Sequence, residues 1–258
     1  MEYINKIFND DCLKVMDQFI ENGIKFSCII ADLPYGTTSC SWDEVIPFEV
    51  MWSKIDKLIT DTGAVVLFGT EPFSSYLRLS NIKEYKYDYK WIKSKVGNFL
   101  NCKNSPLKKY EDIMVFSKGT IANGSPRLMT YNPQGLIEIN KTCSNKGKSR
   151  KGTTIEERPS RQGTYTQKYT NYPNNLLEFK SEDGYHPTQK PVPLLEFLIK
   201  TYSNENDCIL DFTCGSGSTL CACINTGRCY TGIEKEKKYY DISVLRTEQL
   251  LNNKNNNS

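Results

Sequence analysis

Hydrophobic positions along the first half of the chain alternate between short continuous runs and stretches with helical spacing. The runs Phe26–Ala31 and 64–68 predict buried β-strands, and a shorter strand is expected at 7–8. Apolar residues at helical spacing predict helices over 11–19 and Phe48–Leu58. Two further strands are expected at 85–92 and 110–116. This order of strand, helix and strand predicts a parallel, doubly wound sheet.

The same alternation returns in the last quarter of the chain, after a long stretch that lacks it. Helices are predicted over 194–202, Ser218–Thr226 and 237–251, and strands over Cys208–Asp211 and Cys229–Ile233. The predicted fold class is therefore α/β, a doubly wound, Rossmann-like sheet whose strands are mostly parallel.

Residues 119–183 break this rhythm, because apolar residues become sparse and small polar and basic residues dominate. The sequence therefore divides into one half of a domain over 1–118, an insertion over 119–183 and the other half over 184–258. Between Lys141 and Lys168 there are eight basic residues against two acidic ones, although the formal net charge of the whole chain is only +3. Basic residues interleaved with tyrosines suit contact with nucleic acid, and a solvated, flexible loop is the alternative. The candidates for DNA contact are Lys146, Lys148, Arg150, Lys151, Arg158 and Arg161.

The overall composition is typical of a globular protein. With 258 residues, of which 38% are hydrophobic, the chain has the size of one large α/β domain with an insertion. No run approaches the roughly 18 apolar residues of a membrane span, and the N-terminus lacks the layout of a signal peptide, so we expect a cytoplasmic protein with no membrane partner. The ten cysteines include no Cys-x-x-Cys pair, and the single histidine, His186, has no cysteine near it, so no metal site is predicted.

Two polar segments directly follow predicted strands, where an open α/β sheet binds its ligands. The first is Asp32-Leu33-Pro34-Tyr35. The Asp32 carboxylate and the Leu33 carbonyl can accept hydrogen bonds from an exocyclic amine, whose lone pair is otherwise delocalised into its ring. Tyr35 offers a face on which an extruded base can stack, and Pro34 stiffens the turn. An ordinary surface turn after a strand is the alternative interpretation of this segment taken alone.

The second segment is Asp211-Phe212-Thr213-Cys214-Gly215-Ser216-Gly217. Gly215 and Gly217 allow close approach of the backbone to a bulky ligand, and the helix that follows offers unpaired N–H groups. Glu234 ends the next predicted strand about 23 residues after Asp211, where a carboxylate can accept hydrogen bonds from ribose hydroxyls. A nicotinamide or nucleotide site would use the same parts.

Taken together, the two segments resemble the motifs of DNA amino-methyltransferases of the beta group, in which the catalytic segment comes first, then a target-recognition insertion and then the cofactor loop. The family motif is usually Asp-Pro-Pro-Tyr, and Leu33 replaces its first proline here. The resemblance implies S-adenosylmethionine as cofactor, double-stranded DNA as partner, and a methyltransferase sheet in which 119–183 recognises the target. It implies cofactor-binding roles for Asp11, Cys12, Phe68, Lys190, Asp211, Phe212, Gly215, Gly217 and Glu234, and catalytic roles for Asp32, Leu33, Pro34 and Tyr35.

The target base follows from the same resemblance. Aspartate at the first motif position is typical of adenine-N6 members, whereas cytosine-N4 members more often carry serine, so Asp32 favours adenine-N6 methylation with cytosine-N4 as the alternative. A protein-glutamine methyltransferase, an inactive DNA-binding protein and a Rossmann oxidoreductase explain fewer of the features. For Asp11, a helix N-cap is an equally good interpretation. The sequence leaves open whether the chain forms a homodimer or acts beside a cognate restriction enzyme.

Overall fold

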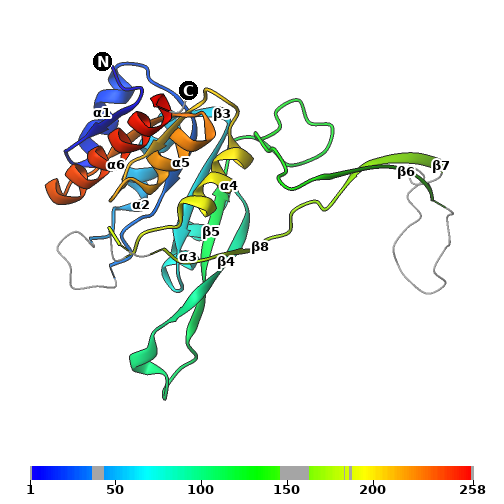
Figure 1. Ribbon diagram of the computed structural model, residues 1–258, viewed down its shortest axis with the longest axis horizontal. Helices are drawn as coiled ribbons and strands as arrows, with labels where there is room; N and C mark the ends of the chain where they lie inside the picture. The colour runs from blue at the N-terminus through cyan, green and yellow to red at the C-terminus, as the bar shows by residue number, and fades with distance from the viewer. Residues whose placement is uncertain (1, 37–43, 146–162, 183, 186–187, 257–258) are drawn as a thin grey trace. The chain divides into compact units, whose positions relative to one another are not determined.

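The computed structural model describes residues 2–36, 44–145, 163–182, 184–185 and 188–256, and these form two compact units (Figure 1). The larger unit runs to Asn132 and resumes at Asn175, and the smaller unit spans Pro133–Asn174. The larger unit contains both sequence motifs.

A single mixed sheet forms the centre of the larger unit. Its eight strands, counted over the described residues, lie in the order β1-β10-β9-β2-β3-β5-β4-β8. The bounds are β1 Lys6–Phe8, β10 Cys229–Ile233, β9 Cys208–Asp211, β2 Phe26–Ala31, β3 Ile59–Gly69, β5 Lys108–Phe116, β4 Tyr85–Gly97 and β8 Leu176–Phe179. Along the sheet, β1, β10, β9, β2 and β3 are all parallel to one another. Strands β4 and β8 are also parallel to each other. The sheet is mostly parallel, as the sequence predicted.

Helices cover both faces of this sheet (Figure 1). Side chains of β2 alternate between the two faces: Ile29 and Ala31 pack with the helices of one face, and Cys28 and Ile30 with those of the other. The first face carries α1 Cys12–Glu21, α2 Phe48–Leu58 and α3 Phe73–Ser80. The second face carries α4 Val192–Tyr202 and α5 Ser218–Thr226. Helix α6 Lys237–Asn255 packs on α5 and β1. Because β2 is buried on both faces, its sequence is a continuous apolar run rather than an alternating one.

The structure differs from the sequence prediction at one side of the sheet. Strand β5 is antiparallel to both β3 and β4, although the sequence predicted a continued parallel rhythm. Only the segment between Gly97 and Lys108 joins β4 to β5, which is too short for the crossover helix that a parallel pair requires. The two strands therefore form a hairpin. Helix α3 was also not predicted, since only Phe73, Ser74 and Leu77 of its residues are buried.

The smaller unit contains a two-stranded antiparallel sheet of β6 Ile137–Asn145 and β7 Gly163–Thr170. The sequence predicted no regular elements in this part of the chain, because apolar periodicity is weak in strands that are exposed on both faces. The expected DNA contacts Lys146, Lys148, Arg150, Lys151, Arg158 and Arg161 lie outside the described residues, as does His186. No helix in the described part of the chain is long and apolar enough to cross a membrane.

Candidate functional site

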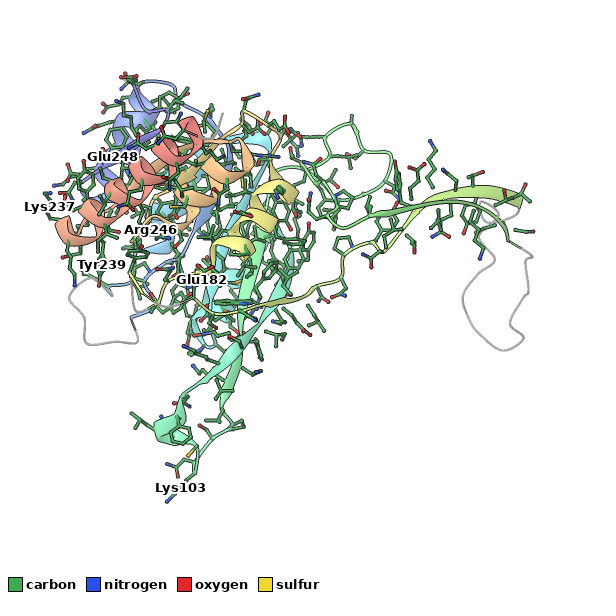
Figure 2. The ribbon with its side chains drawn as sticks, in the orientation of Figure 1. Lys103, Glu182, Lys237, Tyr239, Arg246 and Glu248 are labelled. Atoms are coloured by element: carbon green, nitrogen blue, oxygen red, sulfur yellow. The ribbon has the colours of Figure 1, made fainter. Side chains whose placement is uncertain are left out.

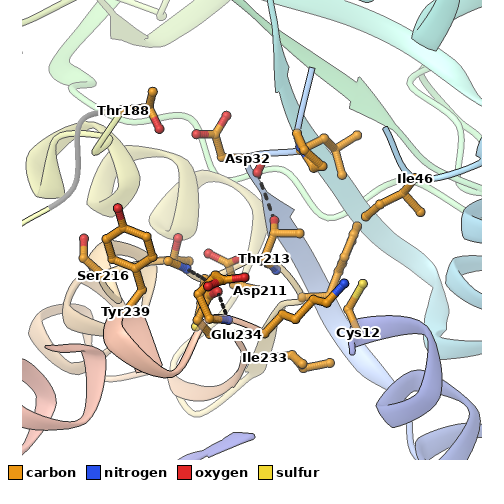
Figure 3. A pocket seen from close by; sticks show the side chains of 18 of the residues that line it. Cys12, Asp32, Ile46, Thr188, Asp211, Thr213, Ser216, Ile233, Glu234 and Tyr239 are labelled. Carbon is orange, nitrogen blue, oxygen red and sulfur yellow. Dashed lines mark hydrogen bonds between the residues drawn. The ribbon is translucent and has the colours of Figure 1, made fainter. Parts of the chain in front are cut away.

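A cavity of about 420 Å³ opens at the carboxyl ends of β2, β9 and β10 (Figure 3). These strands are parallel, so the residues that follow them meet at one edge of the sheet. The lining includes residues from both sequence motifs, from the start of α1, from the segment before α4 and from the end of β10: Asp11, Cys12, Asp32, Leu33, Pro34, Tyr35, Lys190, Asp211, Phe212, Gly215 and Glu234. The structure therefore brings most of the predicted site residues to one place.

A direct hydrogen bond joins the two motifs. The Thr213 hydroxyl donates to the main-chain carbonyl of Asp32 at 3.0 Å, across 181 positions of sequence (Figure 3). The backbone of the first motif is thus fixed by a side chain of the second. A small group bound beside Asp211–Gly217 would lie within reach of Asp32, because both segments line the same cavity.

The carboxylate of Asp32 is held by two side chains. The Tyr35 hydroxyl donates to Oδ1 at 2.7 Å, and the Lys190 ammonium donates to Oδ2. The Tyr35 ring packs on Phe73, with ring centroids 5.0 Å apart and an interplanar angle of 40°. Burial, and then the negative charge of Asp32, raises the pKa of Tyr35 well above its usual value, so the hydroxyl remains a donor. A carboxylate has about four acceptor positions, so Asp32 keeps acceptor capacity for a ligand.

Lys190 is a buried cation shared by two carboxylates. Its Nζ pairs with Asp32 and lies 3.5 Å from Oε2 of Glu111, and it sits 5.1 Å from the centroid of the Phe68 ring. Burial disfavours the charged form of Lys190, but the two carboxylates outweigh it and raise the lysine pKa. Burial likewise disfavours charge on Glu111, yet Lys190 and Lys93 lower its pKa. Lys190 and Glu111 are therefore both charged at neutral pH, and each stabilises the charge of the other.

The glycine loop is held by an acidic side chain and by close packing. Glu234 accepts hydrogen bonds from the backbone N–H groups of Gly215 and Glu236, both at 2.8 Å. Gly217 has φ +80°, and a Cβ there would lie 2.8 Å from Cβ and 3.1 Å from Cα of Ser243. Gly215 has φ +52°, but a Cβ there would meet no heavy atom within 4 Å. Gly217 is therefore required for packing against α6, while Gly215 leaves free space beside the cavity.

Asp211 is the most perturbed carboxyl group of the site. It is 4% exposed, and burial raises its pKa from 3.8 to about 7. Hydrogen bonds from Thr219 and from the Thr213 backbone N–H oppose this shift, while the charges of Asp32 and Glu234 add to it. A cation bound in the cavity would favour the ionised form of Asp211.

Asp11 caps a helix and lines the cavity at the same time. Its Oδ1 accepts from the backbone N–H groups of Leu13 at 3.0 Å and Lys14 at 3.4 Å, as the N-cap of α1. The neighbouring Cys12 has a pKa raised to about 11 by burial and by Asp11, so its thiol is uncharged. The N-cap interpretation is therefore confirmed for Asp11, and its place in the lining keeps the binding hypothesis open.

Two predicted cofactor residues lie outside the described lining of the cavity. Phe68 is buried beneath Lys190, and Gly217 lies in the turn behind Gly215. Both therefore touch the site through a neighbouring residue. Among the described residues, no group of three histidine, cysteine, aspartate or glutamate side chains could hold a metal ion.

Sequence analysis missed several residues that hold the site together. Arg246 on α6 donates to the Ser216 carbonyl at 2.6 Å, and Tyr239, also on α6, lines the cavity (Figures 2 and 3). Nothing in the sequence of that helix distinguishes them. Glu111 does carry a signal, because it and Asp112 are acidic residues directly before the apolar run 113–116 of the same strand. A buried acid in such a strand requires a cationic partner.

Comparison with known proteins gives a consistent result. A family model described as DNA methylase matches residues 26–245. The Type II methyltransferase M1.MboII of Moraxella bovis is 26% identical over 264 residues, covering 96% of this chain and 98% of the relative. The Type II methyltransferase M.HpaI of Haemophilus parainfluenzae is 24% identical, covering 96% and 75% respectively.

Solved structures resemble the fold as well. The structure described as an M1.HpyAVI–SAM complex superposes with a TM-score of 0.62 at 22% identity, covering 93% of this chain and 98% of that one. The cytosine-N4-specific PvuII DNA methyltransferase gives a TM-score of 0.61 at 14% identity, covering 96% and 90%. At these identities the likeness shows the Rossmann-like fold, which confirms the predicted fold class.

Proposed function

Because the chain belongs to the family of N6-adenine and N4-cytosine DNA methylases, in the beta group, we propose that it transfers a methyl group to the N6 amine of adenine in double-stranded DNA. The family makes it a DNA amino-methyltransferase. The observation that supports methylation of an amine at this site is the 3.0 Å hydrogen bond from the Thr213 hydroxyl to the Asp32 carbonyl, because it holds the first motif beside the glycine loop in one cavity.

The residues around the cavity fit S-adenosylmethionine. That cofactor carries a ribose diol, an ammonium group and a sulfonium, and the lining offers the carboxylates of Asp11, Asp211 and Glu234 for these groups. The absence of any heavy atom within 4 Å of a Cβ built on Gly215 leaves room for a bulky ligand against the loop. When bound, S-adenosylmethionine supplies an electrophilic methyl group. We propose that Asp11, Asp211, Gly215 and Glu234 hold it, with Cys12 and Phe212 lining the same cavity.

The first motif activates the amine with one side-chain acceptor and one main-chain acceptor. Asp32 accepts one amine N–H and the Leu33 carbonyl accepts the other, which draws electron density onto the nitrogen as it attacks. No hydrogen bond within the described residues engages the Leu33 carbonyl, so it is available as an acceptor. Tyr35 and Lys190 fix both carboxylate oxygens of Asp32, so the acceptor does not rotate away from the amine.

The base must leave the duplex for this chemistry, since its amine is inaccessible within the stack. The Tyr35 ring, held against Phe73, provides a flat face at the cavity for the extruded base. Adenine rather than cytosine is proposed because the first motif position is aspartate. We further propose that the insertion over 119–183 recognises the target sequence, with Lys146, Lys148, Arg150, Lys151, Arg158 and Arg161 on DNA phosphates.

The test is transfer of label from S-adenosylmethionine to genomic DNA, followed by digestion to nucleosides. The expected product is N6-methyladenine, and N4-methylcytosine as the sole product would overturn the adenine assignment. Asp32→Ala should lower transfer at least about a thousandfold while sparing cofactor binding by calorimetry. Asp32→Asn, which keeps the side-chain volume, controls for misfolding, and Asp61→Ala on the exposed part of β3 should retain full activity.

A further inference from the structure

Strands β4 and β5 extend beyond the sheet as a free two-stranded ribbon (Figure 1). The last β3 partner of β5 is Gly69, opposite Asp112, and the last β8 partner of β4 is Phe179, opposite Lys93. Beyond those points, β4 and β5 pair only with each other, up to Gly97 and Lys108. The four strand residues that follow Lys93, which end at Gly97, and the turn after them extend roughly 15 Å past the sheet.

The ribbon projects from the same edge of the sheet as the catalytic cavity. Strand β5 is antiparallel to β3, so its first residues lie at the carboxyl edge where β2 and β3 end, and the last residues of β4 lie there too. Three strand spacings separate β2 from β4, which places the ribbon about 14 Å to the side of Asp32. The Glu111–Lys190 pair connects the base of the ribbon to that carboxylate.

The ribbon carries positive charges and no negative ones. From Lys93 to Tyr110 the sequence contains five lysines and no acidic residue. No ion pair within the described residues engages Lys103, Lys108 or Lys109. Figure 2 shows Lys103 at the far end of the ribbon. Such a ribbon attracts a polyanion and repels a second copy of itself.

The turn at the end of the ribbon exposes two large apolar side chains. A short 3-10 helix, η1 Phe99–Asn101, exposes Phe99 to 71% and Leu100 to 98%. Asn98, with φ +66°, turns the chain, donates to the Ser105 hydroxyl at 3.2 Å and accepts from the Asn101 side chain at 2.7 Å. Two large apolar side chains are therefore presented outward by a hydrogen-bonded turn.

We propose that this ribbon, residues 93–110, docks in a groove of the DNA duplex beside the target base, with its lysines on phosphates and Phe99 and Leu100 against the bases. The major groove is about 12 Å wide and 8.5 Å deep and admits a two-stranded β-ribbon, so a ribbon of roughly 15 Å reaches its floor. A duplex that delivers a base to Asp32 passes about one groove width from the ribbon. This inference rests on the proposed function, since it takes DNA as the substrate.

The test measures binding of a fluorescein-labelled duplex of about 24 base pairs by anisotropy over a series of salt concentrations. The double variant Lys103→Gln/Lys108→Gln should reduce the slope of log affinity against log salt by about two. The double variant Phe99→Ser/Leu100→Ser should weaken binding about tenfold at every salt concentration with an unchanged slope. Exposed controls elsewhere, Lys83→Gln/Lys200→Gln and Leu79→Ser, should bind as the wild type does.

The outcomes separate this inference from the proposed function. Calorimetry with S-adenosylmethionine should give wild-type affinity for every ribbon variant, because the ribbon lies outside the cavity lining. A wild-type protein that transfers label to DNA while both ribbon variants bind like their controls would overturn the docking alone. Ribbon variants that lower the sedimentation coefficient with an unchanged salt slope would make the ribbon a self-association surface and also overturn it. A wild-type protein that labels no DNA overturns the proposed function instead.

Discussion

Replacing Asp211 with asparagine should stabilise the cofactor-free protein at neutral and alkaline pH. In the folded protein the pKa of Asp211 is raised to about 7 by burial, against 3.8 in the unfolded chain. Between these values the folded state binds a proton that the unfolded state releases, so stability falls as pH rises through this window. Above about pH 7 the folded protein carries a buried Asp211 carboxylate, which the negative charges of Asp32 and Glu234 repel. Asparagine keeps the Oδ1 acceptor for the Thr213 N–H at 3.1 Å without the charge.

The magnitude follows from the difference between the two pKa values. At about 1.4 kcal/mol for each pH unit, the full difference corresponds to roughly 4 kcal/mol, which is an upper bound because the site relaxes around the charge. Urea unfolding should show a gain of roughly 2 to 4 kcal/mol for Asp211→Asn near pH 8, shrinking towards zero near pH 4. A gain independent of pH, or a loss near pH 8, would refute the assigned shift. We expect weaker S-adenosylmethionine binding in the same variant, since the lost charge faces the cavity.

Three further substitutions test the contacts that hold the site together. Lys190→Met should destabilise the protein by about 3 kcal/mol at neutral pH in thermal or urea unfolding, and by less in acid, once Glu111 protonates. It should also lower kcat, because Asp32 loses the cation that holds it. Equal destabilisation at neutral and acid pH would contradict this. Gly217→Ala should cost about 2 kcal/mol or more, because its Cβ meets Ser243, and a fully stable variant would disprove the close packing. Thr213→Val should cost about 1 kcal/mol and lower kcat with little change in cofactor affinity; unchanged kcat would make that hydrogen bond irrelevant to transfer.

The parallel half of the fold and the two motifs could be predicted from local sequence. Strands β2, β9 and β10 and helices α2 and α5 have the predicted bounds. The reason is that a strand buried on both faces must be a continuous apolar run, and a helix on a sheet must carry a stripe of apolar residues. The strand ends then fix where Asp32 and Asp211 lie, since parallel strands end at one edge.

Only the tertiary structure determined which side chains meet at that edge and how far the sheet extends beyond it. The Lys190 ammonium reaches Asp32 across 158 positions, and Glu111 joins the pair from a strand that the sequence predicted in the wrong direction. The hydrophobic pattern of a sequence indicates which residues of each segment are buried. Strand order, strand direction and the pairing of buried charges depend instead on contacts between distant segments. For the same reason the sequence showed the lysines near position 100, and only the pairing of β4 with β5 placed them on a ribbon beside the cavity.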